Sequence, residues 1–256
     1  MCRLLGINAW MGTDDESYAR MFDNVKDMIS VVGLATRRLS DSRVRVAKRH
    51  LSRLVEPARA AHEAGAILPN SVIDRLVGHG LTFDQIQGLV AVLLLTGTES
   101  VSTAFPRIVA LVIDSGELAR LHNDRSLVSA AVDEGVRYTV PSPVMVRSVT
   151  SDYETGGKRF ASGKRVVILT YNLVKHASHF PRPRSFDLSR DVDRDLKHVW
   201  FGAGAHFCLG FGLARMELHS LLDALVDLPG ELRIVKRRYA RNVTVPAYSK
   251  LEVQIR

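Results

Sequence analysis

The segment VWFGAGAHFCLGFGLARMEL, residues 199–218, holds four glycines, one histidine and one of the chain's two cysteines just before a helical pattern. Gly202, Gly204 and Gly210 allow tight or positive-φ backbone and leave room for a flat, bulky group against the chain. Cys208 lies at or near the start of the following helix, where unpaired backbone N–H groups and the helix dipole favour a thiolate. The segment therefore predicts an anionic sulfur on a platform nearly free of side chains.

Several kinds of site use such a cysteine. A nucleophile needs a nearby base, and His206 is only two residues away, where side chains in a turn rarely face each other. A zinc site would need His198, His206 and His219, which lack the paired spacing of zinc motifs. GAGAHF is not a dinucleotide fingerprint, because Phe207 stands at its third glycine position. A haem-thiolate ligand fits better, since one cysteine suffices and the glycines make space for the macrocycle.

Helical patterns dominate the chain. The predicted helices cover residues 14–32, 40–64, 71–80, 82–114 and 126–138, and an amphipathic helix follows Cys208. Its apolar positions are Leu213, Met216, Leu221, Leu225 and Leu228. Short strands are predicted within 140–149 and 159–169, and a terminal hairpin within 231–256.

The predicted helix over 82–114 is apolar on nearly all faces, which is typical of the middle of a protein. Thr82 and Gln85 have capping-box spacing at its start. Polar residues interrupt it at TGTES, residues 96–100, where a buried carboxylate costs free energy unless it is paired or useful. One interpretation is a surface stripe or a kink. The other is a locally opened helix, with ligand access at Gly97 and with Glu99 and Ser100 handling protons.

Glu134 and Arg137 lie three residues apart on one face of the helix predicted over 126–138. They can pair with each other or hold something in common. Taken alone the spacing is weak evidence, because most such pairs lie on the surface and contribute a few tenths of a kcal/mol.

The composition is that of a globular protein. The chain has 256 residues, 46% of them apolar, which allows one large domain or two small ones with a real core. No stretch approaches the ~18 consecutive apolar residues of a membrane span, and the start lacks a signal-peptide pattern. We therefore expect a cytoplasmic protein with no transmembrane segment and, with two cysteines, no disulfide stapling.

Basic residues outnumber acidic ones by 35 to 27, which gives a net charge of +8. The runs RRLSDSRVRVAKRH, residues 37–50, and VKRRYAR, residues 235–241, favour an acidic partner or are simply solvated faces. They lack the aromatic interleaving that base stacking needs, so we expect no nucleic-acid partner.

The motifs together resemble those of a known family. Phe201-x-x-Gly204-x-His206-x-Cys208-x-Gly210 matches position for position the haem-binding loop of the cytochrome P450 family. Glu134-x-x-Arg137 resembles the family's Glu-x-x-Arg pair, and residues 97–100 resemble its oxygen-activating helix segment. Residues 185–202, SFDLSRDVDRDLKHVWFG, are similar to its meander.

The three motifs stand in the family's order, and the resemblance covers essentially the whole chain. It implies a mainly α fold with small β-sheets, in a single domain over 1–256: the soluble, bacterial-type cytochrome P450 fold. Its elements are a long central helix, the Glu-x-x-Arg helix, the meander, the cysteine loop and the following helix.

The resemblance implies a haem b with Cys208 as the axial ligand of the iron, where a thiolate favours O–O cleavage. It also implies that Phe201 and Phe207 shield the sulfur, and that Arg147 and His206 bind the haem propionates. Glu99 and Ser100 would orient water and relay protons, and access at Gly97 would serve the same step.

Glu134 and Arg137 have a structural role in the family, where they tie their helix to the meander. Two positions depart from the family's usual residues. Ser100 replaces threonine, which keeps the hydroxyl but loosens its rotamer. Thr96 stands where alanine or glycine is commoner and crowds the distal face. Neither change removes the chemistry.

The chain is shorter than family members are. CRLLGI, residues 2–7, resembles the end of a helix that lies well inside such chains, so we expect the N-terminal third to be missing and a large apolar surface to be exposed. Two hypotheses follow. The first is a monooxygenase that is either completed by another polypeptide or represented by an incomplete gene model. The second is a non-catalytic remnant that binds haem weakly or acts only as a binding partner.

The substrate and the electron donor follow from the resemblance in outline only. Leu93, Thr96, Val144, Met145 and residues 245–248 are expected to line the distal pocket, which suits an apolar small molecule. Dioxygen is the co-substrate. Electrons are expected from a separate ferredoxin- or flavodoxin-type protein, since no flavin or iron–sulfur domain is attached.

Overall fold

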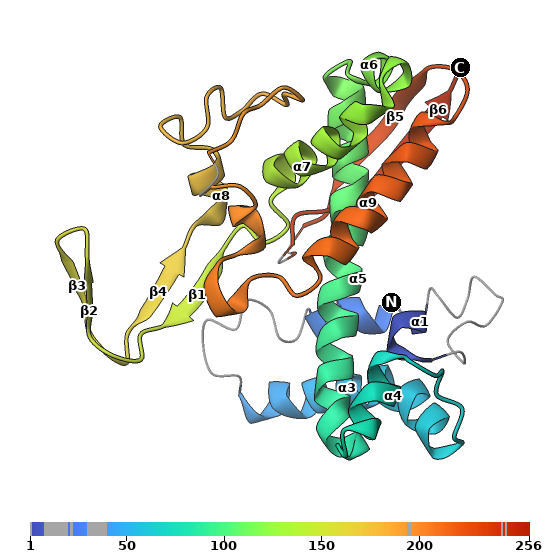
Figure 1. The fold of residues 1–256 in the computed structure, drawn as a ribbon, viewed down its shortest axis with the longest axis vertical. Helices are drawn as coiled ribbons and strands as arrows, with labels where there is room; N and C mark the ends of the chain where they lie inside the picture. Colours follow the sequence, from blue (N-terminus) through green and yellow to red (C-terminus); the bar gives the residue numbers. More distant parts are fainter. Residues whose placement is uncertain are drawn as a thin grey trace. The chain divides into compact units, whose positions relative to one another are not determined.

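The computed structural model describes residues 2–7, 20, 23–29, 40–193, 196–241, 243 and 245–256. Its contacts divide the chain into two compact units, Met1–Ser100 and Val101–Arg256. Helices dominate both, with small two-stranded sheets in the second (Figure 1). The mainly α fold with small sheets is thereby confirmed, while the single-domain organisation stays a prediction.

The first unit is built from helices. They are α1 (Cys2–Leu5), helical residues 23–29, α3 (Asp41–Glu63), α4 (Val72–Gly78) and the first part of α5 (Phe83–Asp114). The hydroxyls of Ser40 and Ser71 accept hydrogen bonds from backbone N–H groups in the first turns of α3 and α4, as N-cap residues do. These two helices therefore begin where the sequence predicts. Of the helix predicted over 14–32, only residues 20 and 23–29 are described, and these are helical.

One apolar cluster fills the first unit. Its buried members are Leu5, Ile7, Val25, Leu54, Val55, Ala58, Ile73, Phe83, Ile86, Val90, Ala91 and Leu94.

The start of α5 has one half of the predicted capping box. The N–H of Thr82 donates to Oε1 of Gln85 at 2.9 Å.

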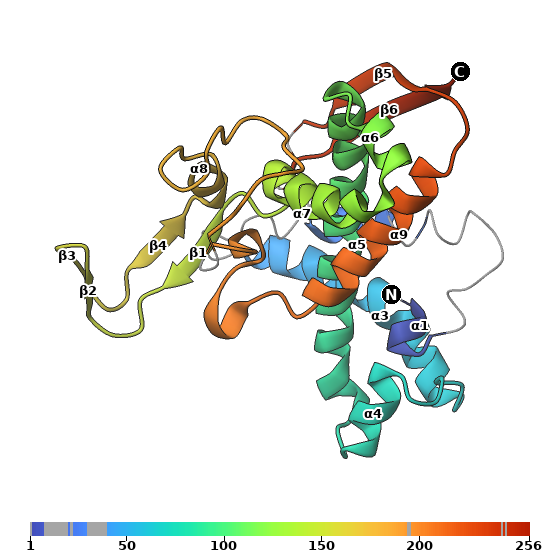
Figure 2. The ribbon, with the colours of Figure 1, turned by 45° about the horizontal axis from the view of Figure 1, so that its top comes forward.

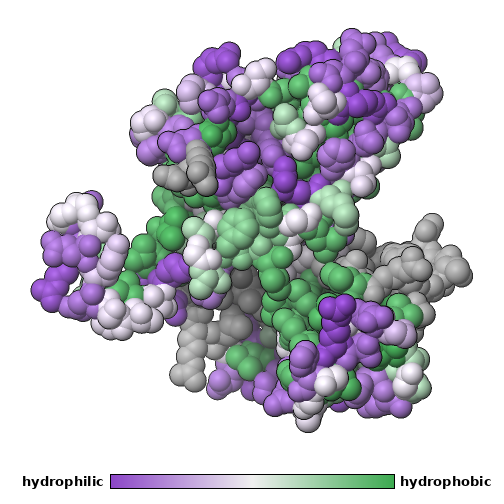
Figure 3. All heavy atoms as spheres, viewed as in Figure 1, coloured by the Kyte–Doolittle hydropathy of each residue, from purple (hydrophilic) through white to green (hydrophobic). Residues whose placement is uncertain are grey.

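Helix α5 departs from two expectations. Leu89 and Val92 are 38% and 53% exposed, and 22% of its most apolar window is buried, so the prediction of burial on all faces is wrong for the described structure. Hydrophobic atoms are exposed along α5 in Figure 3. The helix also continues unbroken through residues 96–100, so no local opening forms there.

By length and composition alone, α5 could cross a membrane, although its longest uninterrupted apolar run covers only residues 89–95. One such helix is weak evidence, because core helices of soluble proteins pass the same test.

The second unit contains the remaining elements. Its helices are α6 (Leu118–Asn123), η1 (Arg125–Leu127), α7 (Val128–Thr139), α8 (Thr170–Val174), η2 (Val199–Phe201), η3 (Gly204–His206) and α9 (Phe211–Val226). Helices α7 and α9 lie side by side in both ribbon views (Figure 2). A Cβ added at Gly135 of α7 would lie 2.8 Å from Cγ1 of Ile108, so glycine there allows α7 to approach α5 closely.

The strands form three antiparallel pairs. β1 (Met145–Ser148) pairs with β4 (Arg165–Ile168), β2 (Tyr153–Thr155) with β3 (Lys158–Phe160), and β5 (Leu232–Tyr239) with β6 (Tyr248–Ile255). The predicted strands and the terminal hairpin are confirmed.

The core of the second unit joins α5, α7 and α9. From α9 the buried residues are Leu218, Leu222 and Val226. Met216 and Leu221, which the sequence places on the apolar face, are 60% and 43% exposed. The predicted face of α9 is therefore wrong: two apolar stripes run along this helix, and packing against α7 selects the other one.

Candidate functional site: the cysteine loop and its supports

The loop before Cys208 depends on glycine backbone geometry. Gly202 has φ 89° and ψ −167°, and Gly204 has φ 64°; the first conformation is almost confined to glycine. The N–H of Cys208 donates to the carbonyl of Phe201 at 3.0 Å, and the N–H of Phe207 donates to that of Gly204 at 3.0 Å. The loop is a tight turn held by its own backbone.

Glycine at 202 also permits a close approach. A Cβ there would lie 3.3 Å from the backbone oxygen of His206 and 3.9 Å from Sδ of Met145. The structure thus brings Met145, predicted to line the substrate pocket, to the cysteine loop. Nothing lies within 4 Å of a Cβ added at Gly204 or Gly210, so these positions border open space.

Cys208 is a half-buried free thiol. Its carbonyl accepts from the N–H of Phe211, the first residue of α9, at 3.2 Å, and Gly210 is the N-cap residue. The predicted position of the cysteine, just before the helix N-terminus, is confirmed.

Aromatic rings surround the base of the loop. The ring centroids of Phe201 and Phe207 are 6.5 Å apart, and Phe211 lies 5.0 Å and 5.3 Å from them. The imidazole of His198 lies 4.8 Å from the ring of Phe211, and its burial lowers its pKa. Phe207 remains 40% exposed, so the two predicted shielding rings are present but one is open to solvent.

The two predicted propionate ligands, Arg147 and His206, come from different elements of the second unit. Arg147 lies on β1 opposite Val166, and among the described residues its side chain donates only to the carbonyl of Val146, at 3.0 Å. His206 is exposed at the end of η3. Both side chains therefore keep unused hydrogen-bond donors.

Val144, which is predicted to line the substrate pocket, is half-buried just before β1.

The Glu134–Arg137 pair is buried and joined by a third residue. Arg137 Nε and Nη2 donate to the two carboxylate oxygens of Glu134 at 2.6 and 2.8 Å, and Arg190 Nε donates to the same oxygens at 3.0 and 3.1 Å. The side chains of Arg137, Glu134 and Arg190 are 0%, 5% and 4% exposed. One carboxylate thus binds two guanidinium groups away from water.

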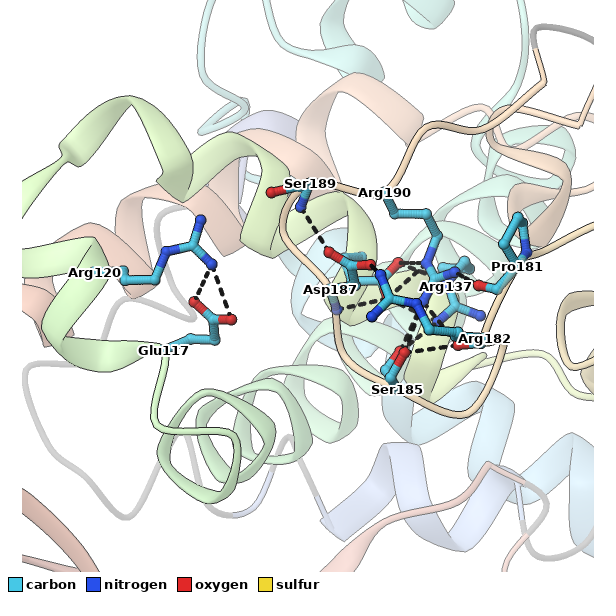
Figure 4. Close-up of polar contacts among 10 residues, drawn as sticks. Glu117, Arg120, Arg137, Pro181, Arg182, Ser185, Asp187, Ser189 and Arg190 are labelled. Carbon is cyan, nitrogen blue, oxygen red and sulfur yellow. Dashed lines mark hydrogen bonds and ion pairs between the residues drawn. The ribbon is translucent and has the colours of Figure 1, made fainter.

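The remaining donors of both arginines go to backbone carbonyls. Arg137 donates to Val174 at 2.8 Å and to Pro183 at 3.1 Å. Arg190 donates to Ser185 at 2.9 Å and also to Pro181. Figure 4 shows both guanidinium groups enclosed by the segment 181–190. This cluster ties α7 to that segment, as the sequence predicts for Glu134 and Arg137.

Sequence reasoning missed Arg190. It lies within the segment 185–202 that resembles a meander, which also carries Arg194, while Arg182 and Arg184 come just before that segment. No spacing distinguishes one of these arginines from the others. Only the burial of Arg190 in the folded structure identifies it as a partner of Glu134.

Lys175, at the end of α8, adds a further cation beside this cluster. Its Nζ lies 3.3 Å from the ring centroid of Tyr138, is buried and has no hydrogen-bond partner. Burial, aided by Arg137, lowers the pKa of Lys175 to about 7.

In the first unit, two of the three hydroxyls of the segment 96–100 donate within the helix, while that of Thr98 is buried without a hydrogen-bond partner among the described residues. Thr96 Oγ1 donates to the carbonyl of Val92 and Ser100 Oγ to that of Thr96, each at 2.7 Å. Burial raises the pKa of Glu99, and Lys26 opposes that shift. Leu93 and Gly97 are half-buried one turn apart on α5, while Thr96 is exposed.

A bare metal site is not supported. Among the described residues, no group of three or more His, Cys, Asp or Glu side chains could hold a metal ion. The zinc interpretation of Cys208 therefore finds no ligand set.

Comparison with known proteins gives a consistent family. The cytochrome P450 family model matches residues 119–227. Cytochrome P450-SU2 of Streptomyces griseolus is 34% identical over 205 residues, 78% of this chain and 49% of that protein. Cytochrome P450 monooxygenase PikC of Streptomyces venezuelae is 31% identical over 197 residues, 72% of this chain and 46% of that protein. The chain thus spans about half the length of these curated relatives.

A solved structure extends the match to nearly the whole chain. Ligand-free CYP164A2 of Mycobacterium smegmatis superposes with a TM-score of 0.82 at 26% identity, covering 99% of this chain and 65% of that one. The fold described above is therefore shared over both units.

Proposed function

Since the chain belongs to the bacterial cytochrome P450 family, we propose that it is the haem-binding part of a monooxygenase that inserts one oxygen atom from O2 into an apolar small molecule. The observation that carries the proposal is a free thiol held by a glycine turn at the start of α9. The buried Glu134–Arg137–Arg190 cluster also supports it, because it contains the Glu-x-x-Arg pair that the family resemblance implies.

The residues present fit a haem. A single thiol is the right donor for an iron that a macrocycle already binds, and the described residues offer no competing metal cluster. Cys208 would be the axial ligand, and the open space at Gly204 and Gly210 would lie against the ring. Arg147 and His206 would bind the propionates with their unused donors, and we propose haem b as the form bound. When bound, this group supplies the activation of O2.

Glu99 and Ser100 are proposed to handle protons. The carboxyl of Glu99 has a raised pKa because of its burial, so it holds a proton at higher pH than an exposed glutamate does. The hydroxyl of Ser100 donates to the helix and can still accept a hydrogen bond. Together they form an acid and an acceptor one residue apart.

The substrate is proposed to be an apolar small molecule. Leu93, Gly97, Val144 and Met145 offer mainly aliphatic or thioether surface, which binds apolar groups without specifying one. Electrons are proposed to come from a ferredoxin- or flavodoxin-type protein, and the cytoplasm, where such donors are reduced, is the proposed location.

A second candidate is a non-catalytic remnant that binds haem or a partner without turnover. One observation favours it: the apolar side chains of Leu89 and Val92 are exposed on α5.

Haem titration of the purified chain tests the proposal. The reduced, carbon-monoxide-bound spectrum of the loaded protein should show the thiolate-type band. Cys208→Ser should lose that band, while Cys2→Ser, which changes the only other cysteine, should keep it. Absence of haem uptake by the wild-type chain would refute both candidates that involve haem.

Turnover separates the two candidates. With a surrogate ferredoxin and its reductase, a monooxygenase consumes reducing equivalents in response to an apolar substrate, and Glu99→Gln should slow it. A thiolate-type spectrum without any such consumption would identify the remnant.

A further inference from the structure

A row of cations on α3 has no role in the proposed site. Arg45, Arg49 and Arg53 follow one another at spacings of four residues, and Lys48 lies three residues after Arg45, which places all four on one face of the helix. All four are exposed. We call these residues the basic face of α3.

The basic face has no internal partner. Within the described residues, none of its four side chains forms an ion pair or a hydrogen bond. By contrast Arg59, one turn further along α3, pairs with Asp84 at 3.2 Å and with Gln87 at 2.9 Å. In the part of the chain that the structure describes, the basic face therefore meets solvent and no pairing side chain.

The arrangement opposes helix stability. Arg45, Arg49 and Arg53 stand at i, i+4 and i+8, and like charges four residues apart on a helix destabilise it by roughly 0.2–0.5 kcal/mol per pair. Two acidic residues lie at the ends of the same face: Asp41, four residues before Arg45, and Glu56, three residues after Arg53. A surface that repels itself in this way is neutralised best by a partner with matching negative charges.

Three classes of polyanion could supply those charges, and the structure favours one. Residues 41–63 contain no Phe, Tyr, Trp, Asn or Gln, and their two imidazoles are half-buried, with His62 stacked on Phe83. Apart from the cations themselves, no side chain there could stack on or read bases, which disfavours nucleic acid. The apolar residues Leu54, Val55 and Ala58 are buried in the core of the first unit, so α3 has no free apolar face to insert into a membrane. Carboxylates match guanidinium groups in bidentate geometry.

We propose that the basic face of α3 docks an acidic helix of a partner protein, whose carboxylates recur at i, i+4 and i+8 and pair with Arg45, Arg49 and Arg53. This surface is independent of the proposed haem site, so the partner need not be the electron donor.

The test uses a fluorescent alanine-based helical peptide with glutamates at i, i+4 and i+8, and a second peptide with the same glutamates spread around the helix. Fluorescence anisotropy at low ionic strength should show that the full chain binds the first peptide about tenfold more tightly. Changing Arg45, Arg49 and Arg53 together to Gln should remove that difference. Salt should weaken the binding.

A matched control separates the surface from net charge. Changing Arg75, Arg233 and Arg238 to Gln removes the same charge from exposed positions elsewhere, and binding should stay within about twofold. The thermal midpoint of the α3 variant should be unchanged or raised, because like charges are removed. Equal loss in both triple variants would overturn the proposal. So would tighter α3-dependent binding of duplex DNA or of phosphatidylglycerol vesicles than of the matched peptide.

Discussion

Two Glu-x-x-Arg pairs lie close together in the chain and have opposite environments. Glu117 and Arg120 pair at 2.9 Å with side chains 15% and 51% exposed, whereas Glu134 and Arg137 pair at 2.6 Å with 5% and 0% exposed (Figure 4). The same spacing thus produces a surface pair in one place and a buried, fully hydrogen-bonded cluster in the other. The difference lies in what surrounds each pair.

The contrast shows why the same Glu-x-x-Arg spacing is structurally important in one pair and not in the other. Arg120 has one partner and water around it, so its charge is screened. Arg137 has lost its water and depends on Glu134 and on three backbone carbonyls of the segment 174–185. Removal of one partner leaves a buried charge unpaired only in the second case.

The largest expected effect is that of Arg137→Ala. It leaves the carboxylate of Glu134 buried with Arg190 and the backbone N–H of Asp187 as its partners and frees three carbonyls, so the free energy of unfolding should fall by about 3–5 kcal/mol. Urea denaturation followed by circular dichroism measures it. A loss below about 1 kcal/mol would show that the cluster is no more than a surface pair.

Gly135→Ala should come next. This glycine lies between the two members of the buried pair, and the added Cβ would meet Ile108 at 2.8 Å, so α7 must move away from α5. We expect a loss of about 1–3 kcal/mol, since overpacking outweighs the better helix propensity of alanine. Gly88→Ala on α5, where nothing lies within 4 Å, is the matched control and should be neutral or stabilising in the same denaturation experiment.

Lys175→Met should stabilise the protein in a pH-dependent way. Burial beside Arg137 lowers the pKa of Lys175 from 10.5 to about 7 in the folded state, so the unfolded chain binds more protons between these values. The cost of burying the lysine is full below pH 7 and disappears as the pH rises toward 10.5.

At pH 6 the Lys175→Met variant should exceed the wild type by about 1–2 kcal/mol, after allowance for solvent screening, and the gap should close at high pH. Urea titrations at pH 6, 8 and about 10 check this. Lys158→Met, on the exposed β3 strand, should show no such trend. If the difference in stability between Lys175→Met and the wild type does not change with pH, burial does not lower the pKa of the Lys175 amine.

The smallest effect is expected for Arg120→Ala, which should change the free energy of unfolding by about 0.2–1 kcal/mol. High salt should remove most of this difference, because the pair is exposed. A loss comparable with that of Arg137→Ala would remove the distinction between the two pairs.

The fold was largely predictable from local patterns. The starts of α3 and α4 follow from Ser40 and Ser71 at their N-caps, and the glycine turn at 202–204 follows from residues that tolerate positive φ. Both depend on bonds between residues close in sequence. Such bonds form whatever the rest of the chain does.

The predictions that failed needed information about distant neighbours. α9 carries two apolar stripes, and only its contact with α7 decides that Leu218 and Leu222 are buried while Met216 is not. α5 is apolar all round, but no described element covers Leu89 and Val92. Composition states how much apolar surface a helix has and does not state what covers it.

The sequence by itself determined the family, through a cysteine loop whose glycines, histidine and cysteine are recognisable without coordinates. It also determined where most helices begin. Only the tertiary structure decided that Glu134 and Arg137 are buried, that Arg190 is their third member and that Glu117 and Arg120 are not such a site. The physical reason is desolvation: a charge becomes structurally decisive when water is removed from it, and residues far away in sequence remove that water.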